Sequence, residues 1–203
     1  MNFKELAQSR RSINYFDPLK DVDEQLLRKI ISLASLSPSA YNLQPWSVIA
    51  VKSKEEKQKL YQLASKQQKI LDAPITLIIT ADREGFDAHN SVWQEVSEKL
   101  GDEKTSKIIA ANKKLYGATE ERKIKFGEIN AGLLAMSIMY AAKHYSVDSH
   151  PVGGIDFKAI KEVFQLPDAF EAVLLICIGY FDHTQSLSPR KPRKPFEEIV
   201  KII

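Results

Sequence analysis

The chain of 203 residues is 44% hydrophobic and 27% charged, with eight glycines and nine prolines. This composition is typical of a globular protein and excludes disordered and collagen-like chains. The formal charge of +3, from 29 basic and 26 acidic residues, is too even to indicate a nucleic-acid partner by itself. The single cysteine, Cys177, excludes an internal disulfide and favours a reduced, intracellular location.

The N-terminus and the longest uncharged stretch both argue against membrane or secretory signals. The opening Met-Asn-Phe-Lys-Glu-Leu has no apolar core of the kind that a secretory signal needs. Residues 129–142 form an uncharged run of 14 residues, whereas a membrane span requires about 20. The sequence therefore predicts no membrane partner and a cytoplasmic protein.

Capping residues and hydrophobic periodicity predict helices interspersed with a few short strands. The first half is expected to hold a short helix capped by Asn2, an extended segment over 10–17, a helix that starts at Asp21 or Asp23 and stops before Pro38, a strand over 46–51, a helix over 54–66 and a strand over 75–81. The second half is expected to hold two helices around Gly101 within 85–119, a long helix over 120–144, a helix over 156–165, a strand over 171–180 and a basic tail. This order predicts a single α+β domain over residues 1–203, with helices around a small central β-sheet.

Several familiar kinds of catalytic site are missing from the sequence. The eight glycines form neither a dinucleotide-binding fingerprint nor a Walker A loop, and no serine lies in a G-x-S-x-G motif. The four histidines lack metal-ligand spacing, so no metal site is predicted: His89, His144, His150 and His183. Any chemistry is expected from a bound cofactor, and no catalytic side chain is predicted.

Paired arginines follow the first predicted helix, in the segment Ser9-Arg10-Arg11-Ser12-Ile13-Asn14. Guanidinium forks beside a serine hydroxyl suit a phosphate group, because they donate charge-assisted hydrogen bonds in fixed directions. Taken alone, the segment also fits a solvated basic turn.

Three further segments carry polar or basic groups outside the predicted core. The loop over 37–46 lies between prolines, and its amides and hydroxyls suit a heteroaromatic ring edge or a polyol chain; an ordinary loop that satisfies its own backbone has the same composition. Residues 150–154 predict a tight turn where backbone can approach a flat ligand. The basic run 190–195 precedes apolar residues, which favours a docked end.

Together these segments resemble the FMN-dependent nitroreductase family over nearly the whole chain. The stretch Pro38-Ser39-Ala40-Tyr41-Asn42-Leu43-Gln44-Pro45-Trp46 is similar to the family's P-S-x-x-N-x-Q-P-W signature. The Arg10-Arg11-Ser12 opening, the Pro151-Val152-Gly153-Gly154 segment and the closing Lys191-Pro192-Arg193-Lys194-Pro195 follow in the family's order and approximate spacing. The resemblance implies a nitroreductase-like FMN-binding fold, an intertwined homodimer with FMN at the subunit interface, and NADH or NADPH as a transient reductant.

The resemblance also implies roles for individual residues. The flavin phosphate would be held by Arg10, Arg11, Ser12, Lys191 and Arg193. The partner subunit would cover the flavin ring with Pro38, Ser39, Ala40 and Asn42. The backbone of one further segment would approach the ring: Pro151, Val152, Gly153 and Gly154. Asn14 would contact the edge of the ring, and Gln67 and Lys69 would touch its pyrimidine side. A lysine there could stabilise negative charge on the reduced ring, although Gln67 and Lys69 also fit as surface residues.

The activity implied by the resemblance is ping-pong reduction of a small-molecule acceptor, such as a nitroaromatic or a quinone, through the flavin. Segment 85–119 would form a lid over the flavin, and residues 189–203 a tail docked on the partner subunit. Three alternatives stay open: another flavin reaction on the same scaffold, such as reductive dehalogenation or flavin fragmentation; a non-catalytic FMN-binding protein; and a weak nucleic-acid binder. The third is disfavoured because the basic tail has no aromatic platform.

Overall fold

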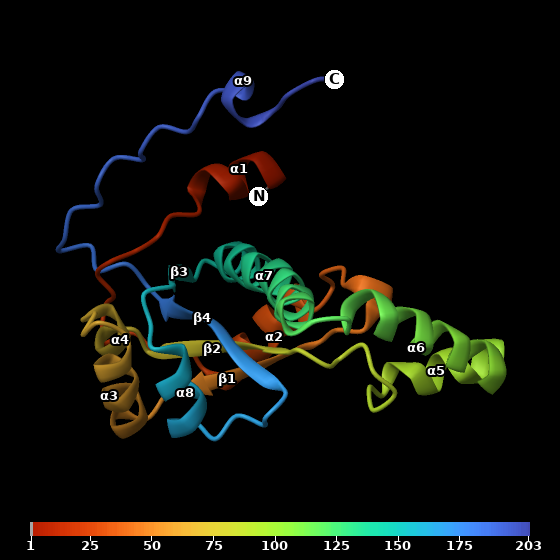
Figure 1. The fold of residues 1–203 in the computed structure, drawn as a ribbon. Helices are drawn as coiled ribbons and strands as arrows, with labels where there is room; N and C mark the ends of the chain where they lie inside the picture. The colour runs from red at the N-terminus through yellow and green to blue at the C-terminus, as the bar shows by residue number, and fades with distance from the viewer. Residues whose placement is uncertain (1) are drawn as a thin grey trace.

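A four-stranded antiparallel sheet forms the centre of the computed structural model, which describes residues 2–203 (Figure 1). The strand order is β1-β2-β4-β3, with β1 at Trp46–Val51, β2 at Ile75–Asp82, β3 at Asp148–Val152 and β4 at Phe170–Gly179. The helices are α1 Phe3–Ser9, α2 Glu24–Ala34, η1 Ala40–Asn42, α3 Lys54–Leu63, α4 Lys69–Asp72, α5 Val92–Leu100, α6 Asp102–Tyr116, α7 Glu120–His144, α8 Phe157–Val163 and α9 Phe196–Ile199. The α+β prediction is confirmed.

Helices cover both faces of the sheet, so β2, one of its two central strands, is buried along its whole length. Alternate side chains of β2 point to opposite faces: Ile75, Leu77 and Ile79 pack against α2 and α7, whereas Ile78 packs on the side of α3 and α8. The apolar run over 75–81, which predicted a buried strand, therefore contributes side chains to two separate hydrophobic cores. Figure 1 shows α7 on one side of the sheet and α3 and α8 on the other.

Three of the four strands agree with the sequence prediction, and the fourth does not. The tight turn expected over 150–154 is wrong for residues 150–152, because these belong to β3, which pairs with β4. Its sequence, Asp-Ser-His-Pro-Val, has residues that are depleted in strands. It forms at an edge of the sheet, where Pro151 is tolerated because its missing N–H leaves no central ladder incomplete.

The predicted helices are confirmed, with one difference near the candidate site. The helix expected over 54–66 ends at Leu63, because Ser65 and Lys66 both adopt a left-handed φ of 53°. The chain then turns into α4, which begins at Lys69. The short elements η1, α4 and α9 were not predicted from periodicity.

Residues 85–119, called the excursion here, form two helices that project from the sheet (Figure 1). They are separated by Gly101, whose φ of +83° favours glycine. Phe86 and Trp93 are buried in a small separate core with Phe126 of α7. Their role is packing of the excursion against α7.

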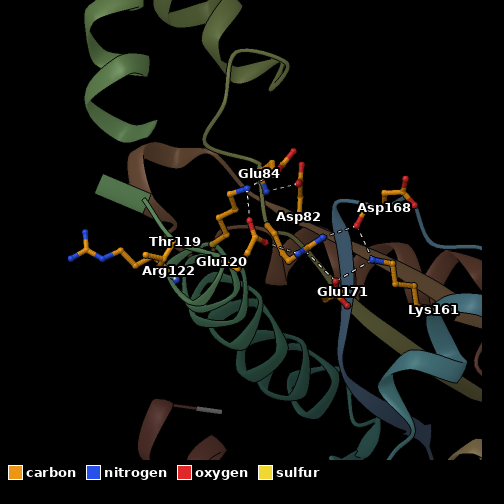
Figure 2. A network of polar contacts seen from close by, with 10 residues as sticks. Asp82, Glu84, Thr119, Glu120, Arg122, Lys161, Asp168 and Glu171 are labelled. Carbon is orange, nitrogen blue, oxygen red and sulfur yellow. Dashed lines mark hydrogen bonds and ion pairs between the residues drawn. The ribbon is translucent and has the colours of Figure 1, made fainter. Parts of the chain in front are cut away.

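A network of ion pairs joins the base of the excursion to the sheet and to α7 (Figure 2). Arg83, which directly follows β2, contacts Glu120 at 3.0 Å and Glu171 at 3.1 Å. Lys123 contacts Glu84 at 3.1 Å and also pairs with Glu120. The residues that flank the excursion on both sides belong to this network, so the network fixes where the excursion leaves the domain.

The C-terminal tail leaves the domain after β4 and runs past α1 (Figure 1). Every residue from 183 to 203 is exposed, including the apolar side chains of Phe196, Ile199 and Ile202. None of the helices between residues 2 and 203 is long and apolar enough to cross a membrane.

Candidate cofactor site

Two segments from opposite ends of the chain meet at a cavity of about 240 Å³. We call this cavity the cationic cradle; it is lined by Arg10, Arg11, Ser12, Ser188, Pro189, Arg190, Lys191 and Arg193. All five residues that were predicted to hold a phosphate line it. No acidic residue lines the cavity.

Hydrogen bonds fasten the two segments of the cradle together. Arg190 donates from Nη2 to the carbonyl oxygens of Gln8, at 2.8 Å, and Arg10, at 2.7 Å. In the other direction, Arg11 donates from Nη2 to the carbonyl oxygen of Ser188 at 2.5 Å. The carbonyl of Gln8 lies in the last turn of α1, where carbonyls lack helical partners, so Arg190 also caps that helix. The tail is thereby held beside residues 10–12.

The cradle has an excess of positive charge. Burial lowers the pKa of Arg10, and the neighbouring charge of Arg190 lowers it further. Among residues 2–203, no ion pair involves Arg10, Arg11, Arg190, Lys191 or Arg193. Clustered cations without an acidic partner repel one another, and a bound anion would remove that repulsion.

A second group of residues, called the Lys69 cluster, lies at the other end of the segment 10–14. The Nζ of Lys69, in the first turn of α4, donates to Oδ1 of Asn14 at 2.7 Å and lies 3.1 Å from Nε2 of His150. The Nδ1 of His150 lies 2.9 Å from the carbonyl oxygen of Ile13. Three elements that are distant in sequence thus converge on one ammonium group.

The Lys69 cluster is half-buried, and burial disfavours charge on both of its titratable side chains. It lowers the pKa of Lys69. It also lowers the pKa of His150 to about 4, with the positive charge of Lys69 as the next cause and a smaller contribution from Arg10. His150 is therefore a neutral imidazole at ordinary pH. The positive charge of Arg10, a cradle residue, therefore also acts on His150 in the Lys69 cluster.

Gly153 and Gly154 follow β3 and border an open groove. A Cβ at Gly153 would have no atom within 4 Å, and a Cβ at Gly154 would lie 3.9 Å from Nε2 of Gln67. Ser65 donates to the carbonyl oxygen of Gly154 at 3.3 Å. Gln67 and Gly154 thus lie close together, and packing does not require a glycine at position 153.

Pro151 and Val152 differ from the two glycines that follow them. Both residues pair with β4, opposite Ile176 and Leu175, and Val152 is 3% exposed in the core beneath α3 and α8. The side chain of Val152 therefore has a packing role. A contact between the backbone of these two residues and a cofactor stays a prediction.

The loop that carries Pro38, Ser39, Ala40 and Asn42 docks on α7. The backbone N–H of Ala40 donates to Oδ1 of the buried Asn130 at 2.9 Å, and Ser39 Oγ accepts from the backbone N–H of Gln44 at 3.0 Å. Tyr41, Asn42 and Gln44 all have a φ near +50°. Side-chain hydrogen bonds therefore hold a strained loop conformation in place.

One chain does not bring this loop to the cationic cradle. The loop is held at Asn130, whereas residues 12–14 lie along β3, which follows the end of α7 at His144. Those two positions on α7 are separated by roughly 21 Å, at 1.5 Å per residue. Within residues 2–203, no hydrogen bond joins the loop to the cradle or to the Lys69 cluster.

Comparison with known proteins decides the family. Residues 7–180 match the Nitroreductase family. The chain belongs to the nitroreductase family. A curated relative, provisionally named NAD(P)H nitroreductase MhqN, from Bacillus subtilis strain 168, is 30% identical over 202 residues and covers 98% of each chain.

Solved nitroreductase structures confirm the fold. The chain superimposes on the provisional nitroreductase ydfN of Bacillus subtilis with a TM-score of 0.91 and 28% identity, covering 99% of this chain and 98% of that one. A provisional nitroreductase from Exiguobacterium sibiricum, crystallised in complex with FMN, gives a TM-score of 0.84 at 25% identity, covering 99% and 97%. The resemblance drawn from the sequence motifs is confirmed.

Two residues of this nitroreductase-family site were missing from the sequence prediction. Arg190 was seen only as part of a basic run, and His150 only as part of the turn over 150–154 and as a histidine without metal-ligand spacing. Their partners lie 180 to 182 residues away for Arg190, and 81 and 137 residues away for His150. One sequence gives no signal for contacts at such separations.

Proposed function

We propose that this nitroreductase-family protein is an FMN-dependent NAD(P)H oxidoreductase that reduces nitroaromatic or quinone-type acceptors by a ping-pong mechanism. The observation that carries the proposal is the placement of the cationic cradle and the Lys69 cluster at the two ends of the segment 10–14. This extended segment spans roughly 13 Å. It suits an elongated ligand with a phosphate at one end and a ring at the other.

The chemistry of the cradle fits the phosphate of FMN. A phosphate monoester carries nearly two negative charges and three acceptor oxygens, and the cradle offers guanidinium groups, a lysine and the Ser12 hydroxyl without an acidic competitor. Each charge-assisted hydrogen bond contributes roughly 1.5–3 kcal/mol. Loss of one such donor is therefore expected to weaken FMN binding by about tenfold or more.

The Lys69 cluster and the glycines fit the ring end of the same ligand. Lys69 has two neutral acceptors, and no ion pair of residues 2–203 neutralises its charge. It can therefore stabilise negative charge that develops on a neighbouring ring. The open space at Gly153 lets a flat ligand approach the backbone closely.

Bound FMN would supply the redox chemistry, taking a hydride from NADH or NADPH and passing two electrons to the acceptor. The residues of this chain bind and orient it: the cradle holds the phosphate, and Lys69 provides a fixed positive charge. No side-chain acid or base is needed for hydride transfer. NAD(P)H and the acceptor would occupy the site in turn, which agrees with the absence of a dinucleotide-binding fingerprint from the sequence.

A homodimer would complete the site. Phe3, Leu33, Ile129 and Leu133, on α1, α2 and α7, are 39–70% exposed although they are apolar, as are several residues of the tail. Burying them in a subunit interface would remove this surface from water. The loop over 38–42 would then cover the ring from the partner subunit, the excursion would form a lid, and residues 189–203 would dock on the partner. A cytoplasmic location agrees with the need for NAD(P)H and also stays a proposal.

The test is the visible spectrum of the purified, FMN-loaded protein under anaerobic conditions. Addition of NADPH or NADH should bleach the flavin bands, and a quinone or a nitroaromatic should restore them. Arg11→Ala and Arg193→Ala should each bind FMN about tenfold more weakly or worse. Arg28→Ala, which removes an exposed guanidinium of α2 outside the cradle, should bind FMN like the unchanged protein.

Other outcomes separate the alternatives. Flavin bands that neither nicotinamide bleaches would indicate a binding protein or a different flavin reaction. A protein that cannot be loaded with FMN, or unchanged FMN affinity in both cradle variants, would contradict the proposed site.

A further inference from the structure

We infer that His150 is a positioning residue for the proposed flavin reaction: its neutral imidazole accepts a hydrogen bond from Lys69 and thereby fixes the lysine charge at the ring end of the site. The inference rests on the proposed function, because it assigns His150 a role toward the same bound flavin. It concerns a residue for which the sequence predicted no role.

The hydrogen bonds of His150 determine which ring nitrogen carries the proton. The carbonyl oxygen of Ile13 can only accept, so Nδ1, at 2.9 Å, must donate to it. In a neutral imidazole the other nitrogen, Nε2, then has a free lone pair. Lys69 Nζ, at 3.1 Å, can only donate. The two contacts are therefore compatible with one protonation state, the neutral Nδ1–H tautomer.

A protonated His150 would oppose this arrangement. An imidazolium carries an N–H on both nitrogens, so Nε2–H would point at the ammonium group of Lys69. Arg10 adds a further positive charge nearby, and burial of the ring disfavours an imidazolium as well. Only the hydrogen bond to the carbonyl of Ile13 raises the pKa of His150, and burial together with the charges of Lys69 and Arg10 outweighs it, so the ring stays neutral.

The placement of Lys69 explains why an acceptor is needed. A lysine side chain has four rotatable bonds, and its head would otherwise turn toward water. Asn14 and His150 accept two of its three N–H groups from two directions. Both acceptors are neutral, so they orient the ammonium group without cancelling its charge. The third N–H and the full charge remain available to the ligand.

Redox potential measures this role directly, because a fixed positive charge stabilises the reduced flavin more than the oxidised one. His150→Leu removes both polar nitrogens, and His150→Gln keeps one donor and one acceptor. In FMN-loaded protein, we expect His150→Leu to lower the preference for reduced over oxidised flavin about tenfold. For a two-electron couple this equals a fall in potential of about 30 mV. His150→Gln should restore most of the potential.

A double-mutant cycle with Lys69→Met tests whether His150 acts through the lysine. If it does, His150→Leu should change the potential by less than about 10 mV in protein that already carries Lys69→Met, which is about twofold in preference. An unchanged potential in His150→Leu alone would overturn the inference. An equal fall with and without Lys69 would also overturn it.

Nitrogen NMR of the unaltered, FMN-free protein provides a second measurement that needs no variant to fold. Its histidine side chains, labelled with ¹⁵N, should include one that is the neutral Nδ1–H tautomer at pH 7 and still neutral at pH 5. An Nε2–H tautomer or an imidazolium at His150 would overturn the inference. Failure of the unaltered protein to bind FMN would instead contradict the proposed function, and the tautomer would still report on the contact between His150 and Lys69.

Discussion

The two ends of the proposed site, the cationic cradle and the Lys69 cluster, differ in how they present positive charge. The cradle gathers half-buried and exposed cations from two distant segments and offers no neutralising acid, so its attraction for an anion comes from the number of charges. The Lys69 cluster has one half-buried cation whose position is set by two neutral acceptors. A phosphate keeps its charge when the flavin is reduced, whereas the ring gains electrons. We therefore expect the cradle to determine the affinity for FMN and the Lys69 cluster to determine the redox potential of the bound flavin.

Removal of two cradle arginines should produce the largest effect and should leave the potential unchanged. The combined variant Arg11→Ala and Arg193→Ala loses charge-assisted hydrogen bonds from both segments, so FMN binding should weaken by roughly 100-fold or more. The oxidised and reduced forms should be affected alike. Fluorescence titration gives the affinity, and dye equilibration gives the potential.

If the redox potential of this variant fell as far as that of Lys69→Met, the cradle would also control the potential. That result would contradict the separate roles expected for the cradle and the Lys69 cluster. Lys59→Met, which removes an exposed lysine of α3 paired with Glu56, is the matched control. It should change neither quantity.

At the ring end, Gly153→Val should weaken FMN binding by about tenfold or more without reducing the stability of the FMN-free protein. A Cβ at this position would have no atom within 4 Å beyond its chain neighbours, so we expect a bound ligand to be what a side chain here would meet. Gly179→Ala is the contrasting change, because its Cβ would lie 2.5 Å from Pro74 Cδ and 3.0 Å from Phe16. That overpacking should cost about 1–3 kcal/mol of unfolding free energy.

Urea denaturation of the FMN-free variants, followed by FMN titration, separates the two glycines. Full FMN affinity in Gly153→Val would mean that the flavin does not approach the backbone here.

A smaller effect is expected from Arg190→Ala, because Arg190 holds the tail against α1 by hydrogen bonds to two backbone carbonyls. Release of the tail should weaken FMN binding by about fivefold. Arg190→Lys keeps the charge but loses the fork, so it should recover only part of the affinity. Lys194→Ala, which removes a tail cation outside the cradle, serves as the control in the same titration.

Equal losses in Arg190→Ala and Lys194→Ala would show that only the total charge of the tail matters. The positioning role of Arg190 would then be wrong.

The sequence predicted the cradle better than the Lys69 cluster, and the reason is physical. Arginines that lie next to one another already indicate an anion site, because charge density is local. The contact between Lys69 and His150 depends on β3 forming at the sheet edge and on the left-handed turn at Ser65 and Lys66. Neither feature has a periodic signal, since Asp148–Val152 is polar and contains a proline.

The same contrast explains the outcomes for the fold. Strands β1, β2 and β4 carry apolar, β-branched runs and were predicted, because such runs are typical of strands. The loop over 38–42 was identified through its family motif. What it contacts could not be predicted, because its partner Asn130 lies 90 residues further along the chain.

The most direct test of the account compares the binding of FMN with that of riboflavin, which has the same ring and ribityl chain without the phosphate. In fluorescence titrations of cofactor-free protein, FMN should bind roughly 100-fold more tightly. That ratio should collapse in the combined cradle variant and persist in Lys69→Met. Equal affinity for the two ligands, or a ratio that Lys69 controls and the arginines do not, would contradict the assignment of the phosphate to the cradle.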